Sequence, residues 1–163
     1  MDLFFDGVAV KNKRRVHFHE FMQEAHELIH IWRQNNRNVR QAEPMGPVAA
    51  KIAENTALLC FDEFEVRDIA DAMIVSRLFT ALLELGVVVV ATSNRHPDEL
   101  YKDGLQRDLF LPFIKLIKAK MDILHLELLV LAHMVFAKSM LFLLAFRKSQ
   151  ILYLLYKQDR IFR

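Results

Sequence analysis

The chain has 163 residues, of which 53% are hydrophobic and 26% charged, a composition that can supply a core and excludes a disordered tail. A single cysteine, Cys60, excludes an internal disulfide framework, and a net charge of +2 gives no general attraction to nucleic acid or anionic membrane. The first residues resemble neither a secretory signal nor an Arg- and Ser-rich transit peptide. We therefore expect a soluble globular domain.

The first third of the chain predicts a strand, a helix and a loop. Residues 14–19 alternate as a short strand does. The next apolar residues recur at helical spacing up to about Gln34; they are Phe21, Met22, Ala25, Leu28, Ile29 and Trp32. Residues 35–47 are polar and contain Pro44 and Gly46, which indicates a loop. Pro47 then opens a short predicted helix over residues 48–54.

The middle of the chain predicts a strand, a helix and a second strand. Residues 57–61 and 87–90 are continuous apolar runs, typical of parallel strands buried on both faces. Between them Asp68 is a predicted helix N-cap and Gly86 a predicted helix end. Such a βαβ unit belongs to a parallel sheet covered on both sides, so the predicted fold class is α/β.

The last third predicts two helices, a strand and an apolar tail. A short helix runs from His96 through Tyr101, a longer one from Leu105 to about Lys120, and a strand covers residues 121–126. Residues 128–146 must be tested as a membrane span. Their Leu, Val and Phe residues favour insertion by roughly 5 kcal/mol, whereas Lys138 near the midpoint opposes it by about 3 kcal/mol and His133 opposes it further, so the sum is close to zero. We therefore favour a buried or aggregation-prone segment over a true membrane span for these residues.

Polar residues follow both central strands. Asp62 and Glu63 end the first, and Thr92, Ser93 and Asn94 end the second. Ligands of open parallel sheets bind at the carboxyl ends of the strands, where an Asp can hold Mg²⁺ through water and a Glu can polarise an attacking water. Arg107 could stabilise transferred charge in a neighbouring subunit. Each group also has a simpler explanation. The two acidic residues could only solvate the end of a strand, residues 92–94 could only form a turn, and Arg107 could be an ordinary surface arginine.

Four segments closely resemble the AFG-one-like AAA-type ATPases, whose members are called lactation-elevated ATPase in mitochondria and ZapE in bacteria. They are LLCFDEF at 58–64, DIADAMI at 68–74, VVVVATSNR at 87–95 and GLQR at 104–107. The resemblance covers about residues 1–124 and implies an AAA-type P-loop NTPase core that hydrolyses ATP with Mg²⁺. It implies that Asp62 and Glu63 are the Walker B pair, with Asp62 holding Mg²⁺ through water. It further implies that Asn94 is the sensor-one residue and Arg107 the arginine finger.

The chain departs from the family pattern in two places. No Gly-Lys-Ser or Gly-Lys-Thr occurs, although the family's phosphate-binding loop lies just before a Met-Asp-Leu-Phe-Phe like the one that opens this chain. Residues 125–163 form an apolar, divergent tail, predicted to be helical and to come from an altered transcript. We therefore divide the chain into a partial ATPase core, 1–124, and the tail, 125–163. This fragment is expected to be inactive by itself, or to act as a non-catalytic or dominant-negative partner.

The resemblance also implies partners and a location. Expected partners are further copies or full-length family subunits, and the clients are membrane-associated or misfolded proteins. The location is the mitochondrial matrix or inner membrane in a eukaryote, and the cytoplasm near the inner membrane in a bacterium; no targeting signal is read in the chain.

Two further patterns in the sequence point to other functions. His26, Glu27 and His30 form a His-Glu-x-x-His motif on a predicted helix, the spacing of a zinc metalloprotease, with Glu54 as a candidate third ligand. Both histidines fall on the polar flank of that helix, so a solvated pair is the simpler interpretation. A basic cluster, Lys11 with residues 13–15, has no aromatic stacking platform beside it, so a solvated loop is favoured over nucleic-acid binding.

Overall fold

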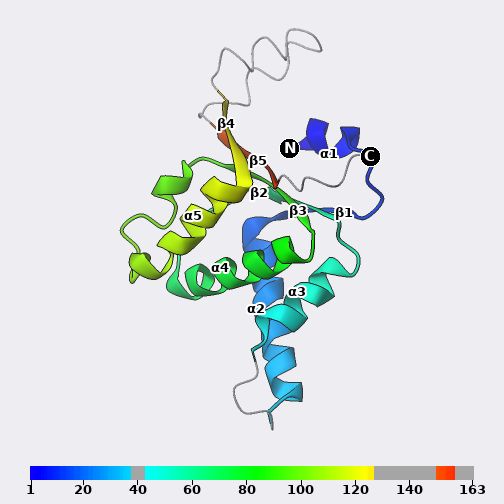
Figure 1. Ribbon diagram of the computed structural model, residues 1–163, viewed down its shortest axis with the longest axis vertical. Helices are drawn as coiled ribbons and strands as arrows, with labels where there is room; N and C mark the ends of the chain where they lie inside the picture. The colour runs from blue at the N-terminus through cyan, green and yellow to red at the C-terminus, as the bar shows by residue number, and fades with distance from the viewer. Residues whose placement is uncertain (38–42, 127–149, 157–163) are drawn as a thin grey trace.

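The computed structural model describes residues 1–37, 43–126 and 150–156, which form an α/β fold (Figure 1). The helices are α1 (Asp2–Gly7), α2 (Phe18–Asn35), α3 (Met45–Ala53), α4 (Ile69–Glu84) and α5 (Leu111–Lys120), with 3-10 turns η1 (Pro97–Glu99) and η2 (Arg107–Leu109). The strands are β1 (Lys13–His17), β2 (Leu58–Asp62), β3 (Val88–Ser93), β4 (Met121–Leu126) and β5 (Gln150–Tyr156).

The strands form one sheet in the order β1-β2-β3-β5-β4. β1, β2 and β3 are parallel, with Cys60 of β2 opposite Arg15 on one side and Val90 on the other. β5 is antiparallel both to β3 and to β4. The predicted βαβ unit is confirmed, because β2, α4 and β3 follow one another and the two strands pair in parallel.

Both faces of the sheet are covered at β2. Successive residues of a strand point to opposite faces, and the residues of β2 pack into a different cluster on each face. Leu59 and Phe61 belong to the main core, which includes residues of α2, α3, α4 and α5. Leu58 and Cys60 form a second cluster with Val90, and the partly buried Phe4 and Phe5 of α1 pack against it. Figure 1 accordingly shows α2, α3, α4 and α5 on one side of the sheet and α1 on the other.

Local signals explain the helix boundaries. Asp68 caps α4 by accepting a hydrogen bond from the Asp71 amide at 2.9 Å, and Gly86 beyond its end adopts a φ of 83°. α3 begins at Met45, so its first turn includes Pro47 rather than starting after it. α5 begins at Leu111 instead of the predicted Leu105. Gln106 has a left-handed φ of 56°, which is incompatible with a right-handed helix running through it. Pro112 suits the first turn of a helix, so the helix begins at Leu111.

The tail departs from the sequence prediction where the structure describes it. Residues 150–156 were expected to be helical but form the strand β5. β5 forms a strand because it pairs with both β3 and β4, so that backbone groups at the edges of these strands are hydrogen-bonded. The run 128–146 lies outside the described residues. Among those described, no helix has the length and apolar character needed to cross a membrane.

Candidate functional site

The structure brings three of the four candidate residues to one end of the sheet. Asp62 is the last residue of β2, Glu63 follows it, and Asn94 follows the last residue of β3. The two strands are parallel, with Phe61 opposite Ala91, so these residues emerge at the same edge. A hydrogen bond of 2.7 Å from the Phe64 amide to the Thr92 carbonyl keeps the chain segments together beyond the paired strands.

Asp62 is held by Arg15 of the neighbouring strand. Arg15 Nε donates to Asp62 Oδ2 at 2.6 Å, and the same guanidinium also pairs with Asp2 of α1. The Asp62 side chain is 17% exposed. These two carboxylates raise the pKa of Arg15, and the arginine in turn lowers the pKa of Asp2. The sequence placed Arg15 in a predicted strand and in a basic cluster, and neither pattern named Asp62 as its partner.

Glu63 has an unusual backbone conformation, with a φ of 54°. A left-handed φ in a residue other than glycine costs about 1–2 kcal/mol and persists where the surroundings enforce it. Its exposed side chain lies between Asp62 and the buried Phe64. The Phe64 ring packs against Phe18, with ring centroids 4.3 Å apart, and against Phe61, Phe79 and Phe113. The turn therefore presents a carboxylate to solvent from a firmly anchored base.

The polar residues after β3 divide into two kinds. Thr92 makes a long hydrogen bond of 3.4 Å to the Phe61 carbonyl, and Ser93 is buried and donates to the Phe64 carbonyl at 2.8 Å. Both hydroxyls therefore bind the main chain. Asn94 is exposed. Of the three residues considered from sequence as able to orient a water, Asn94 has its side chain at the surface.

Arg107 belongs to a separate part of the site. It begins η2, and its Nη2 donates to the Asp98 carbonyl at 2.6 Å. Its Nε is buried and has no hydrogen-bond partner among the described residues. The Asp98 carboxylate accepts from Lys118 Nζ at 2.9 and 3.0 Å, which lowers the pKa of Asp98 and fixes η1 to α5. In the described residues no hydrogen bond or ion pair joins Arg107 to Asp62, Glu63 or Asn94.

The acidic residues fit Mg²⁺ only through water. One oxygen of Asp62 is taken by Arg15, and the described residues contain no group of three His, Cys, Asp or Glu side chains that could hold a metal ion. Mg²⁺ usually keeps several waters and is held by one or two carboxylates together with substrate phosphates. Asp62 and Glu63 thus suit the carboxylate ligands of such a magnesium site. The groups that bind the substrate phosphates would be other ones.

The zinc-protease alternative is not supported by the structure. Both histidines of the motif lie on α2, but His26 Nε2 is 2.9 Å from Asp71 Oδ1 of α4, and His30 Nε2 is 2.6 Å from Gln34 Nε2. Glu54 pairs with Lys51 at 2.9 Å. The described part of the chain forms no three-ligand metal group, so the proposed zinc site is not assembled there.

The basic cluster mostly serves the fold. Lys13 Nζ donates to the Phe5 and Val8 carbonyls at 2.5 and 2.9 Å, at the carboxyl end of α1, and lies 4.7 Å from the centre of the Phe5 ring. Arg14 forms a two-pronged pair with Glu24 of α2. Together with Arg15, these side chains fasten β1 to both of its neighbouring helices.

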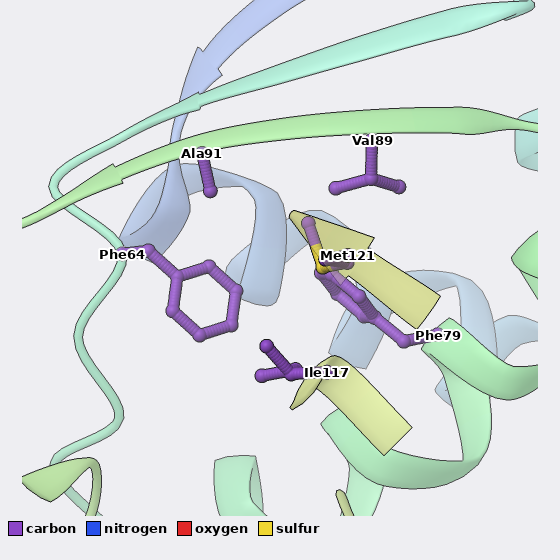
Figure 2. Close-up of a pocket in the computed structure, with 6 residues that line it drawn as sticks. All are labelled: Phe64, Phe79, Val89, Ala91, Ile117 and Met121. Carbon is purple, nitrogen blue, oxygen red and sulfur yellow. The ribbon is translucent and has the colours of Figure 1, made fainter. Parts of the chain in front are cut away.

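A small apolar cavity lies beneath the candidate site and measures about 10 Å³. Figure 2 shows Phe64, Val89, Ala91 and Met121 around it, with Phe79 and Ile117 completing the lining. This volume is about that of one water, and a lining without polar groups keeps such a space dry. The cavity belongs to the core and is too small for a substrate.

Comparison with known proteins follows the same segments. The family model described as AFG1-like ATPase matches residues 1–130. Lactation elevated protein 1 homolog B of Danio rerio is 52% identical over 132 residues, which are 78% of this chain and 26% of that protein. Cell division protein ZapE of Escherichia coli K12 is 42% identical over 127 residues, 78% of this chain and 32% of that protein. The chain thus spans about a quarter to a third of these relatives, and no solved structure matches it significantly.

Proposed function

The chain belongs to the AFG1-like ATPase family, and from this premise we propose that residues 1–124 are part of an AAA-type P-loop core in which Asp62, Glu63 and Asn94 act on Mg²⁺-bound ATP. The observation that carries the proposal is the convergence of these residues at the carboxyl edge of two paired parallel strands. Ligands of open α/β sheets bind at this edge.

Each residue has a role that suits its surroundings. Asp62, oriented by Arg15, would hold Mg²⁺ through a water molecule. Glu63, exposed on a fixed turn, would accept a proton from the attacking water, and Asn94 would orient that water or the terminal phosphate. The bound metal would supply neutralisation of phosphate charge. Arg107 would reach the nucleotide of a neighbouring subunit, since its described hydrogen bond is to the Asp98 carbonyl and none joins it to the other three.

We propose that the 163 residues by themselves do not hydrolyse ATP, because they contain no Gly-Lys-Ser or Gly-Lys-Thr to hold the β- and γ-phosphates. In the whole protein, hydrolysis would drive the handling of membrane-associated or misfolded proteins, in mitochondria or at a bacterial inner membrane. The relative ZapE is named as a cell division protein. The ATP hydrolysis proposed here does not depend on a role in cell division.

Equilibrium binding of a fluorescent ATP analogue tests the proposal. The purified chain, shown to be folded by circular dichroism, is titrated with Mg²⁺ and again with EDTA. Weak or absent binding is expected for the chain alone. Micromolar Mg²⁺-dependent binding would contradict the need for a separate phosphate-binding loop, and Asp62→Asn would then show whether the metal still uses this carboxylate.

A non-catalytic role as a partner subunit is the second candidate, and the position of Arg107 favours it. Mixing the chain with an intact AFG1-like subunit should change the ATPase rate of that subunit. The Arg107→Ala variant should lose this effect, whereas Arg33→Ala, which removes an exposed arginine of α2, should keep it. Failure of the wild-type chain to co-purify with or alter the intact subunit would reject the partner role.

A further inference from the structure

Ser93, the last residue of β3, connects the two turns that carry Glu63 and Asn94. Its side chain is 3% exposed. The hydroxyl donates to the Phe64 carbonyl at 2.8 Å and accepts from the Arg95 amide at 3.2 Å. One oxygen thus bonds the main chain one residue after Glu63 and one residue after Asn94.

On the β2 side, this contact completes the anchoring of Phe64. The Phe64 amide donates to Thr92, its carbonyl accepts from Ser93, and its ring packs into the aromatic core beside the cavity of Figure 2. Asp62 is fixed in β2 on the other side of Glu63. Because both neighbours are fixed, Glu63 is confined to its left-handed backbone conformation, which a free chain would avoid.

On the β3 side, the same hydroxyl sets the direction of the chain after the strand. Asn94 lies between Ser93, whose side chain is bonded to Phe64, and Arg95, whose amide is bonded to Ser93. The Arg95 guanidinium also reaches Glu65, with Nη2 3.4 Å from Oε1, so a second contact spans the two turns. The hydroxyl can do this because it donates one hydrogen bond while accepting another.

We propose that Ser93 is a positioning residue, whose hydroxyl fixes the backbone that presents Glu63 relative to the backbone that presents Asn94. What those two groups do rests on the proposed function; that their turns are joined through Ser93 does not. The neighbouring Thr92 provides the contrast, since its hydroxyl makes one long bond to Phe61 within the paired strands and joins neither turn to the other.

Nuclear magnetic resonance of the 163-residue chain tests the proposal with three variants. Ser93→Ala should shift the amide resonances of Glu63, Phe64, Asn94 and Arg95 together and speed hydrogen exchange of the Arg95 amide about 3- to 10-fold, as expected for loss of one hydrogen bond. Ser93→Thr keeps the hydroxyl and should restore the Glu63 and Asn94 signals. Thr92→Val removes a hydroxyl from the adjacent position and should leave these signals in place.

The outcomes separate positioning from general destabilisation. Urea unfolding of each variant gives its stability, and Val75→Ala, a change in the core of α4, supplies a destabilised chain with the turns intact. Unchanged Glu63 and Asn94 signals in Ser93→Ala, or equal shifts in Val75→Ala, would overturn the proposal. ATP-analogue binding is measured in parallel. Failure of the proposed function would appear there alone, because the resonances report the turns whether or not nucleotide binds.

Discussion

The structure predicts opposite effects for the same substitution at two glycines, Gly104 between η1 and η2 and Gly46 in α3. The Tyr101 ring lies directly over Gly104, so that a β-carbon added there would stand 2.5 Å from the Cε1 and Cε2 atoms of the ring. The ring cannot swing away freely. Tyr101 is 5% exposed, its hydroxyl donates to the Leu105 carbonyl at 2.9 Å, and its ring meets Phe110 with centroids 5.5 Å apart.

The cost of Gly104→Ala follows from these contacts. Forcing an extra carbon into a packed site costs about 1–3 kcal/mol, and losing the Tyr101 hydrogen bond adds about 0.5–1.5 kcal/mol. We expect Gly104→Ala to lower the free energy of unfolding by about 2–4 kcal/mol. Gly46 is the matched control, because it lies in α3 with no atom within 4 Å of an added β-carbon. Gly46→Ala should raise stability by about 0.5–1 kcal/mol.

Urea unfolding at equilibrium measures both values, followed by circular dichroism and by the fluorescence of Trp32, the one tryptophan of the chain. Coincident transitions from the two probes establish that the two-state treatment applies. A Gly104→Ala variant within about 0.5 kcal/mol of the wild type would refute the close packing of Tyr101. A destabilising Gly46→Ala would refute the helical assignment of the first turn of α3.

Three further predictions concern single groups. Glu63→Gly should raise the free energy of unfolding, measured in urea, by up to about 1 kcal/mol. Glycine adopts the left-handed backbone without strain, and part of this gain is offset by the larger chain entropy that glycine loses on folding. Destabilisation would contradict the strain at Glu63. Burial raises the pKa of the Cys60 thiol to about 11 from 9.0, so stability should decline as pH rises above 9, where only the unfolded thiol ionises; Cys60→Ala should flatten this alkaline limb. Lys118 lowers the pKa of Asp98, so the Lys118–Asp98 pair stabilises the fold above about pH 4, and this stabilisation is lost as acid protonates the folded carboxyl. If the stability of Lys118→Met fell with acid in the same way as that of the wild type, this role of the pair would be refuted.

Much of the fold was predictable because its signals are local. The apolar runs of β2 and β3, the Asp68 cap and Gly86 each act through neighbouring residues, and the structure places all of them as expected. The start of α5 was misplaced because the left-handed backbone of Gln106 interrupts the run from Leu105, and the local signal of Pro112, which suits a first helical turn, was not used. β5 was missed because edge pairing depends on a distant partner strand.

The candidate site divides in the same way. Polar residues after buried parallel strands are visible without any structure, and they indicated Asp62 and Glu63 together with residues 92–94. The family resemblance then singled out Asn94. The sequence did not indicate that Arg15 would hold Asp62, a contact across 47 positions of the chain. Nor did the residue pattern by itself distinguish Ser93 from Asn94, because both are ordinary turn residues; the structure shows that Ser93 is buried and Asn94 exposed.

Several contacts that shape this edge of the sheet join described residues to one another. Asp62 is oriented by Arg15, the Glu63 turn by Phe64, and the Asn94 turn by Ser93. Each of these contacts joins two groups of the protein, and side chains held in place by their own chain lose less entropy when a ligand binds. If the folded chain binds no nucleotide, we propose that phosphate contacts are what it lacks, because Asp62, Glu63 and Asn94 are already held by Arg15, Phe64 and Ser93.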